Sequence, residues 1–207
     1  MFSANSIVFV VDDDPSVRDA LSNLLDSVGL AAQTFGSSEE FLSSSRPEVP
    51  SCLVLDAKLP GMSGPEFQEE LRRTGIRIPI IFITAHGDVP MTRKVMKAGA
   101  IEFLTKPFQK GELLGAIRHG LETDQSRRQE QAVVSELMSR YEKLTSRERE
   151  VLELVTTGLM NKEIAAKLGL SEITVKIHRR QVMTKMEATS LADLVRMADK
   201  VKSQSKS

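Results

Sequence analysis

Short apolar segments alternate with segments of helical periodicity from residue 7 to residue 121. Runs rich in Val, Ile, Leu and Phe predict strands, and apolar residues that recur every three or four positions between them predict helices. Five such strand–helix units indicate an α/β fold built on a five-stranded doubly wound parallel sheet. The expected strands span residues 7–11, 30–35, 51–55, 79–83 and 101–104, and the expected helices span 15–28, 37–44, 65–73, 89–98 and 109–121.

The pattern after residue 144 is helical throughout. Residues that commonly cap helix N-termini mark four starts, and glycines mark two of the ends. The second and third of these helices, joined by the short Gly169-Leu170 connection, have the dimensions of a helix-turn-helix in a small all-α domain. The four helices are expected to begin at Thr145 or Ser146, Asn161, Ser171 and Ser190, and to end near Gly158, Gly169, Met186 and Val201.

The segment between the two patterns, residues 122–143, lacks glycine and proline. Apolar residues keep helical spacing at both of its ends, whereas residues 122–131 are polar all round. We favour one long helix that continues from the first pattern into the second, and the alternative is a disordered break within 122–131. The expected domains are therefore residues 1–121, a helical linker over 122–143, and residues 144–207.

Composition and charge narrow the class of protein. The 207 residues include 41% hydrophobic and 27% charged residues, which is ordinary for a globular chain. No apolar run is long enough to cross a bilayer, so we expect a cytoplasmic protein without membrane partners. Residues 1–124 carry 17 acidic and 12 basic residues, and residues 125–207 carry 11 and 16. This asymmetry suits a metal ion in the first half and a polyanion in the second, although it could also be ordinary scatter.

Candidate chemistry lies where four of the expected strands end. The acidic run Asp12-Asp13-Asp14, then Asp56, Thr84 and Lys106 each follow or close an apolar run. Because parallel strands end along one edge of a sheet, these side chains should converge there. Carboxylates are suitable ligands for Mg²⁺, and a hydroxyl with an ammonium group suits phosphoryl oxygens. The pattern indicates a phosphorylation switch.

The third helix of the second half has a basic face opposite its apolar stripe. Val175, Arg179, Val182 and Met186 form the stripe expected to be buried. Ile173 and a basic set lie on the opposite side, where basic side chains can reach phosphates or base edges and an aliphatic one can contact a thymine methyl group. A solvated basic face with a stray isoleucine is the alternative. The DNA-contacting residues that we predict are Thr174, Lys176, Ile177, Arg180 and Thr184.

These motifs resemble a known family. The segments VVDDD, LVLDAKLPGMSG, FITAHGDVPM and FLTKPF resemble the receiver domains of two-component response regulators. The segment LTSREREVLELVTTGLMNKEIAAKLGLSEITVKIHRRQVMTKM resembles the LuxR-type helix-turn-helix. In this order they are similar to the NarL/FixJ family, whose receiver is flavodoxin-like. A closer similarity to regulators of aromatic catabolism implies such an operon as the target.

The resemblance implies a role for each matching residue. Asp56 corresponds to the phosphoacceptor, and Asp12, Asp13, Asp56 and the backbone carbonyl of Lys58 correspond to the Mg²⁺ ligands. Thr84 and Lys106 correspond to the groups that bind the phosphoryl oxygens, and the Lys106–Pro107 bond is expected to be cis. Phe103 corresponds to an aromatic switch that follows Thr84, although it could simply be a core residue. Asp14 is not expected to be a ligand. His86 either influences dephosphorylation or merely covers the site.

The family also implies partners and leaves alternatives. The expected partners are a sensor histidine kinase, double-stranded promoter DNA, RNA polymerase and, after phosphorylation, a second copy of this chain. The chain is expected to be a regulator and not an enzyme, apart from its own phosphorylation and slow dephosphorylation. One alternative is a haloacid-dehalogenase-like phosphatase that uses Asp12 and Asp14. Another is a DNA-binding regulator that does not depend on phosphate.

Overall fold

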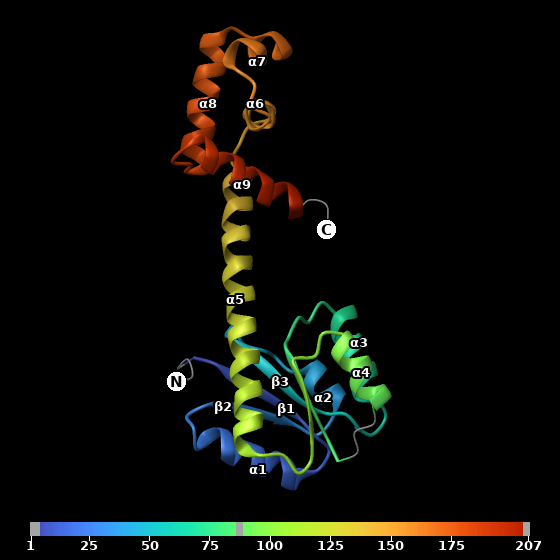
Figure 1. Ribbon diagram of the computed structural model, residues 1–207. Helices are drawn as coiled ribbons and strands as arrows, with labels where there is room; N and C mark the ends of the chain where they lie inside the picture. The colour runs from blue at the N-terminus through green and yellow to red at the C-terminus, as the bar shows by residue number, and fades with distance from the viewer. Residues whose placement is uncertain (1–4, 86–88, 205–207) are drawn as a thin grey trace. The chain divides into compact units, whose positions relative to one another are not determined.

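The chain divides into two compact units, Met1–Arg128 and Gln129–Ser207 (Figure 1). The computed structural model describes residues 5–85 and 89–204. Among these residues no helix combines the length and the apolar character needed to cross a membrane.

A parallel sheet forms the centre of the first unit (Figure 1). Its strands are ordered β2-β1-β3-β4-β5, and each pair of neighbours is parallel. This order is that of a flavodoxin-like doubly wound sheet, so the predicted fold is confirmed. Within the described residues the strands are β1 (Ile7–Val11), β2 (Ala31–Phe35), β3 (Ser51–Asp56), β4 (Ile80–Thr84) and β5 (Glu102–Thr105).

Helices cover both faces of this sheet, because successive strand residues point to opposite sides. Phe9 and Phe82 pack on one side with residues from α2 (Ser38–Ser43), α3 (Gly64–Arg73) and α4 (Val89–Lys97). Val8, Val10, Ile81 and Ile83 pack on the other side with residues from α1 (Pro15–Asp26) and α5 (Lys110–Glu142). The central strands β1, β3 and β4 are therefore buried on both faces, as expected for a parallel sheet, whereas the edge strands β2 and β5 are partly exposed.

The strand register brings the predicted strand ends to one edge. Val11 pairs with Leu55, Asp56 pairs with Ile83, and Thr84 pairs with Thr105. Asp12 and Lys106 are the residues that follow β1 and β5. The candidate residues thus lie within one residue of the row across the sheet that contains the Thr84–Thr105 pair.

Helix α5 is continuous over 33 residues, which confirms the predicted long helix. Its segment 122–131 is polar all round in sequence, and yet Asp124 is fully buried. One oxygen of the Asp124 carboxylate accepts the Ser51 backbone N–H at 3.0 Å, and the carboxylate also pairs with Arg127 and Arg128. This carboxylate ties α5 to the beginning of β3.

Close packing surrounds the same contact. A Cβ atom at Gly120 would lie 3.0 Å from the Cβ of Cys52, so α5 approaches β3 very closely there. Cys52 is fully buried. Burial and then the negative charge of Asp124 raise the pKa of the Cys52 thiol, which leaves it unreactive.

The second unit is helical around its own core. In the part of this unit that the structure describes, Val151, Ile164, Val175 and Leu194 contribute one core side chain from each helix that follows α5. The helices are α6 (Ser146–Thr156), α7 (Asn161–Leu168), α8 (Glu172–Met186) and α9 (Leu191–Gln204). This arrangement contains the predicted helix-turn-helix, α7 and α8.

Three of the predicted caps are present and one is wrong. Thr145 and Glu148 form a capping box at α6, the Ser171 hydroxyl accepts the Thr174 N–H at α8, and the Ser190 hydroxyl accepts the Asp193 N–H at α9. Asn161 does not cap α7. Its side-chain oxygen accepts a hydrogen bond from Arg179 at 2.7 Å instead, so it connects α7 to α8.

We predict that Asp124→Ala lowers the stability of the first unit by about 2–3 kcal/mol, since it leaves the Ser51 N–H without its acceptor. Hydrogen exchange of the β3 amides should report a lower opening free energy. Glu122→Ala, at an exposed position half a turn earlier, is the matched control and should exchange as wild type. Unchanged protection of β3 in the Asp124 variant would contradict the structural role of this carboxylate.

Candidate functional site

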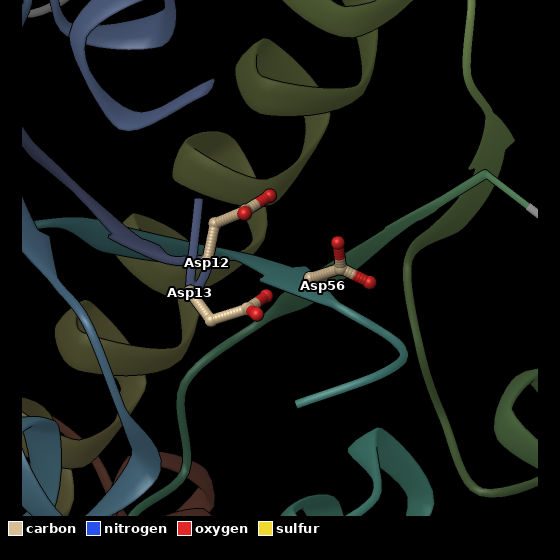
Figure 2. A group of neighbouring side chains, drawn as sticks. All are labelled: Asp12, Asp13 and Asp56. Carbon is tan, nitrogen blue, oxygen red and sulfur yellow. The ribbon is translucent and has the colours of Figure 1, made fainter. Parts of the chain in front are cut away.

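Three carboxylates gather where β1 and β3 end (Figure 2). Asp12 and Asp13 follow β1, and Asp56 is the last residue of β3. One carboxylate oxygen from each lies within 4.8 Å of the others. Asp12 and Asp56 are buried, whereas Asp13 is exposed, so the cluster has one side open to solvent.

The ammonium group of Lys106 bridges two of these carboxylates. Its Nζ donates to Asp12 Oδ2 at 2.7 Å and to Asp56 Oδ2 at 2.8 Å. The Lys106 side chain is 21% exposed, and the two carboxylates are more buried than that. The structure thus brings together the predicted residues from the ends of β1, β3 and β5.

Burial and the ion pair between Asp12 and Lys106 shift the pKa values of both groups. Burial raises the pKa of Asp12, because a carboxylate is poorly solvated there, although the hydrogen bond from Lys106 and the Asp14 N–H oppose the rise. Burial alone would lower the pKa of Lys106, but the hydrogen bonds and charges of Asp12 and Asp56 outweigh it and the pKa rises. Lys106 therefore remains an ammonium ion at neutral pH.

The donor set fits a divalent metal ion. Asp12 Oδ1 accepts the Asp14 N–H at 3.0 Å, and Asp56 Oδ1 accepts the Lys58 N–H at 2.9 Å. Among the described residues, none donates a hydrogen bond to the Asp13 carboxylate. Three carboxylates and one ammonium group leave two net negative charges, which suits a hard divalent cation. The role predicted for the Lys58 carbonyl oxygen stays a prediction.

Thr84 and Phe103 lie on the neighbouring strands. Thr84 is fully buried at the end of β4, and its carbonyl oxygen accepts the Lys106 N–H at 2.7 Å. Phe103 is half-buried in β5, with its ring centroid 6.4 Å from that of Phe82. The Lys106–Pro107 bond is cis, as the family resemblance implies. His86 lies outside the described residues.

Two contributors to this site were not predicted. Arg18 on α1 donates to the backbone oxygens of Asp12 at 2.7 Å and Asp13 at 3.0 Å. A Cβ atom at Gly64 would lie 2.7 Å from a Phe82 ring carbon and 2.9 Å from the Ala57 Cα, so only glycine fits beside the end of β3. The position of Arg18 in the first turn of the helix after the acidic run could have predicted its contact with this loop.

Asp14 has a structural role outside the cluster. Its carboxylate accepts the Ser16 N–H at 2.8 Å and caps α1, and Pro15 occupies the first turn. Asp14 therefore does not join Asp12 as the second carboxylate that the phosphatase alternative needs. This placement agrees with the expectation that Asp14 is not a metal ligand.

The exposed face of α8 has the predicted composition. Val175, Val182 and Met186 of the expected buried stripe are buried, but Arg179 is only half-buried. Ile173 and Ile177 are 74% and 53% exposed. The hydroxyl of Thr174 hydrogen bonds to the Ser171 hydroxyl at 2.8 Å, which places this residue at the helix start. Lys176, Arg180 and Thr184 are also exposed on this helix, together with Glu172 and Gln181, which were not predicted to contact DNA.

Comparison with known proteins matches both units. The "Response regulator receiver domain" family matches residues 8–118, and "Bacterial regulatory proteins, luxR family" matches residues 142–198. Nodulation protein W of Bradyrhizobium diazoefficiens is 57% identical, over 95% of this chain and 87% of that protein. Response regulator protein TodT of Pseudomonas putida is 46% identical over the same shares. The structure of response regulator StyR is 52% identical with a TM-score of 0.85, over 95% of this chain and 99% of that one.

These matches agree with the resemblance inferred from the motifs. The residues matched by the receiver family include the acidic cluster, and the residues matched by the LuxR family include the helix-turn-helix. The matches do not favour the phosphatase alternative, and the position of Asp14 does not favour it either.

We predict that Asp13→Asn stabilises the first unit by about 1 kcal/mol when Mg²⁺ is absent. Unit charges this close repel by about that amount in water, and the substitution removes one of them. The same variant should gain less stability from added MgCl2. Thermal unfolding followed by circular dichroism, with EDTA and then with MgCl2, measures both effects.

Asp19→Asn is the control for this prediction, because Asp19 is exposed on α1 outside the cluster. It should leave the response to MgCl2 unchanged. If Asp13→Asn destabilised the metal-free protein, repulsion between the carboxylates would not be the main electrostatic effect at this site.

Proposed function

We propose that phosphorylation of Asp56 controls this chain. The chain belongs to the NarL/FixJ family of response regulators, with a receiver domain followed by a LuxR-type DNA-binding domain. Asp56 is the acceptor of a phosphoryl group from the histidine of a sensor kinase. The observation that carries this proposal is the position of Lys106, whose ammonium group contacts both Asp12 and Asp56 at the edge of the sheet.

The transfer exchanges one bond for another. A carboxylate oxygen of Asp56 attacks phosphorus, the phosphorus–nitrogen bond to the kinase imidazole breaks, and an acyl phosphate forms. Mg²⁺ held by Asp12, Asp13, Asp56 and the Lys58 carbonyl oxygen would neutralise charge on the phosphoryl oxygens. Lys106 supplies a further positive charge beside the acceptor. The chain takes part in this reaction and in slow dephosphorylation, but it does not turn over another substrate.

The acyl phosphate then acts as a stored signal. It adds about −1.5 to −2 charges and several strong acceptor oxygens. We propose that the Thr84 hydroxyl and the Lys106 ammonium bind these oxygens, and that Phe103 turns inward behind Thr84. To reverse a 1:99 population, such contacts must favour the active state by about 5.5 kcal/mol.

The output is binding of promoter DNA by a phosphorylated homodimer. A dimer would present two α8 helices to successive major grooves of a roughly palindromic site. The exposure of Ile177, Lys176 and Arg180 supports base and phosphate contacts from this helix, with Thr174 and Thr184 nearby. RNA polymerase is the proposed downstream partner, and the cytoplasm is the proposed location.

Domain limits and target genes are also proposals. The limits remain 1–121, 122–143 and 144–207, although the contact of Asp124 with Ser51 supports a receiver whose packing extends further along α5. An aromatic catabolic operon remains the proposed target. The pathway is open to test, because a relative at 57% identity is called a nodulation protein.

Beryllofluoride with Mg²⁺, which mimics the acyl phosphate, should convert the full chain from monomer to dimer and tighten its binding to promoter DNA. Sedimentation velocity and a DNA-binding titration measure the two effects. Asp56→Asn should show neither. An unchanged sedimentation profile of the wild type would contradict the phosphorylation switch, and full regulated activity in Asp56→Asn would favour the phosphate-independent regulator.

Arg180→Ala should relax base preference at one position of each half-site, at a cost of about 1–3 kcal/mol against the preferred sequence. Loss of a phosphate contact would instead weaken all sequences alike and reduce the salt dependence of binding. Competition titrations at several salt concentrations separate these cases. Arg73→Ala removes one positive charge from the receiver and serves as the control. If Arg180→Ala weakens every sequence equally, the assignment of Arg180 to base readout is wrong.

A further inference from the structure

Arg18 contacts the acidic loop from the following helix. Its Nη1 donates to the carbonyl oxygen of Asp12 at 2.7 Å and to that of Asp13 at 3.0 Å. The arginine is half-buried on α1, one turn after the loop. One guanidinium nitrogen thus fixes two consecutive peptide groups, those of Asp12 and Asp13.

The other side of the loop is also held. The Asp12 N–H donates to the Phe35 carbonyl oxygen at 3.2 Å, and the Asp14 N–H donates to Asp12 Oδ1 at 3.0 Å. These bonds hold the Asp12 N–H, the Asp12 carboxylate and one side of the Asp13–Asp14 peptide group, but neither reaches the Asp13 carboxylate. Within the described residues, the Asp13 carboxylate has no hydrogen-bond donor of its own. Its direction therefore depends on the peptide groups that Arg18 holds.

We propose that Arg18 is a positioning residue that sets the Asp12 and Asp13 carboxylates at the spacing a divalent cation needs. This inference rests on the proposed role of these carboxylates as Mg²⁺ ligands. Groups that orient metal ligands without touching the metal commonly change metal affinity by 10–100-fold when they are removed. Because the Asp13 carboxylate is exposed and accepts no hydrogen bond from the described residues, we expect the metal affinity of this pair to depend strongly on Arg18.

The direction in which Mg²⁺ affinity changes when Arg18 is replaced distinguishes a positioning role from a purely electrostatic one. Arg18 carries a positive charge near an acidic cluster, so through-space repulsion alone would weaken Mg²⁺ binding, and its removal would strengthen it. Positioning predicts the opposite, because a loop with freed carbonyl groups would let the Asp13 carboxylate sample other directions. Arg18→Met removes both the charge and the hydrogen bonds and keeps an aliphatic side chain.

Arg46 provides a matched control. It is also a half-buried arginine whose Nη1 donates to two backbone carbonyl oxygens, those of Phe41 at 2.8 Å and Ser44 at 3.2 Å. These carbonyl groups belong to the end of α2, away from the acidic cluster. Arg46→Met therefore loses the same kinds of hydrogen bond and the same charge, and also the guanidinium contact with the Phe41 ring, without freeing the metal ligands.

Isothermal titration of the full chain with MgCl2 tests the proposal. The dissociation constant for Arg18→Met should rise by about tenfold or more over wild type, and that of Arg46→Met should stay within about twofold. The rate at which acetyl phosphate phosphorylates Asp56 at saturating MgCl2 should change much less than the affinity. Arg18→Gln, which keeps one donor and no charge, should also weaken binding, and it replaces the Met variant if that variant does not fold.

Equal or tighter Mg²⁺ binding by the Arg18 variants would overturn the positioning role. So would a loss of affinity in Arg46→Met as large as in Arg18→Met. A wild type that does not bind Mg²⁺ would overturn the metal site and this inference with it. A wild type that binds Mg²⁺ with the expected Arg18 dependence, but is not phosphorylated on Asp56, would overturn the proposed function alone.

Discussion

The contact of one ammonium group with two buried carboxylates is the constraint around which the first unit is arranged. Asp12 and Asp56 are buried at the ends of adjacent strands, where an unpaired charge would be costly. Lys106 pairs with both, but only because β5 ends at the same edge of the sheet as β1 and β3. The register of the whole sheet is therefore tied to the chemistry at its edge.

The surroundings of this contact leave little freedom. Gly64 lies so close to Ala57 and Phe82 that no side chain fits beside the end of β3. At the opposite end of the same strand, Asp124 holds the Ser51 N–H. The strand that carries Asp56 is thus fixed at both ends, and a change at the acidic edge is more readily expressed in the less buried β5.

Local patterns in the sequence predicted the strands, the long helix and the convergence of Asp12, Asp56 and Lys106, because parallel strands align their ends whatever connects them. Asp124 could not be predicted in this way. It lies in a segment that is polar all round, and its burial depends on a contact with a residue 73 positions earlier. Asn161 looked like a helix cap because the distant Arg179 that binds it is not visible in local spacing.

Lys106 also joins the acidic site to the neighbouring strand β4. Its side chain pairs with the carboxylates, while its backbone N–H is bonded to the carbonyl oxygen of Thr84. A phosphoryl group on Asp56 would compete with Asp12 for the ammonium group, so the pairing seen here would have to rearrange. Because Phe103 is only three residues away in β5 and packs against Phe82, that rearrangement would act on a half-buried ring rather than a locked core. This arrangement supports the proposal that a change of charge at Asp56 becomes a change of packing in β5.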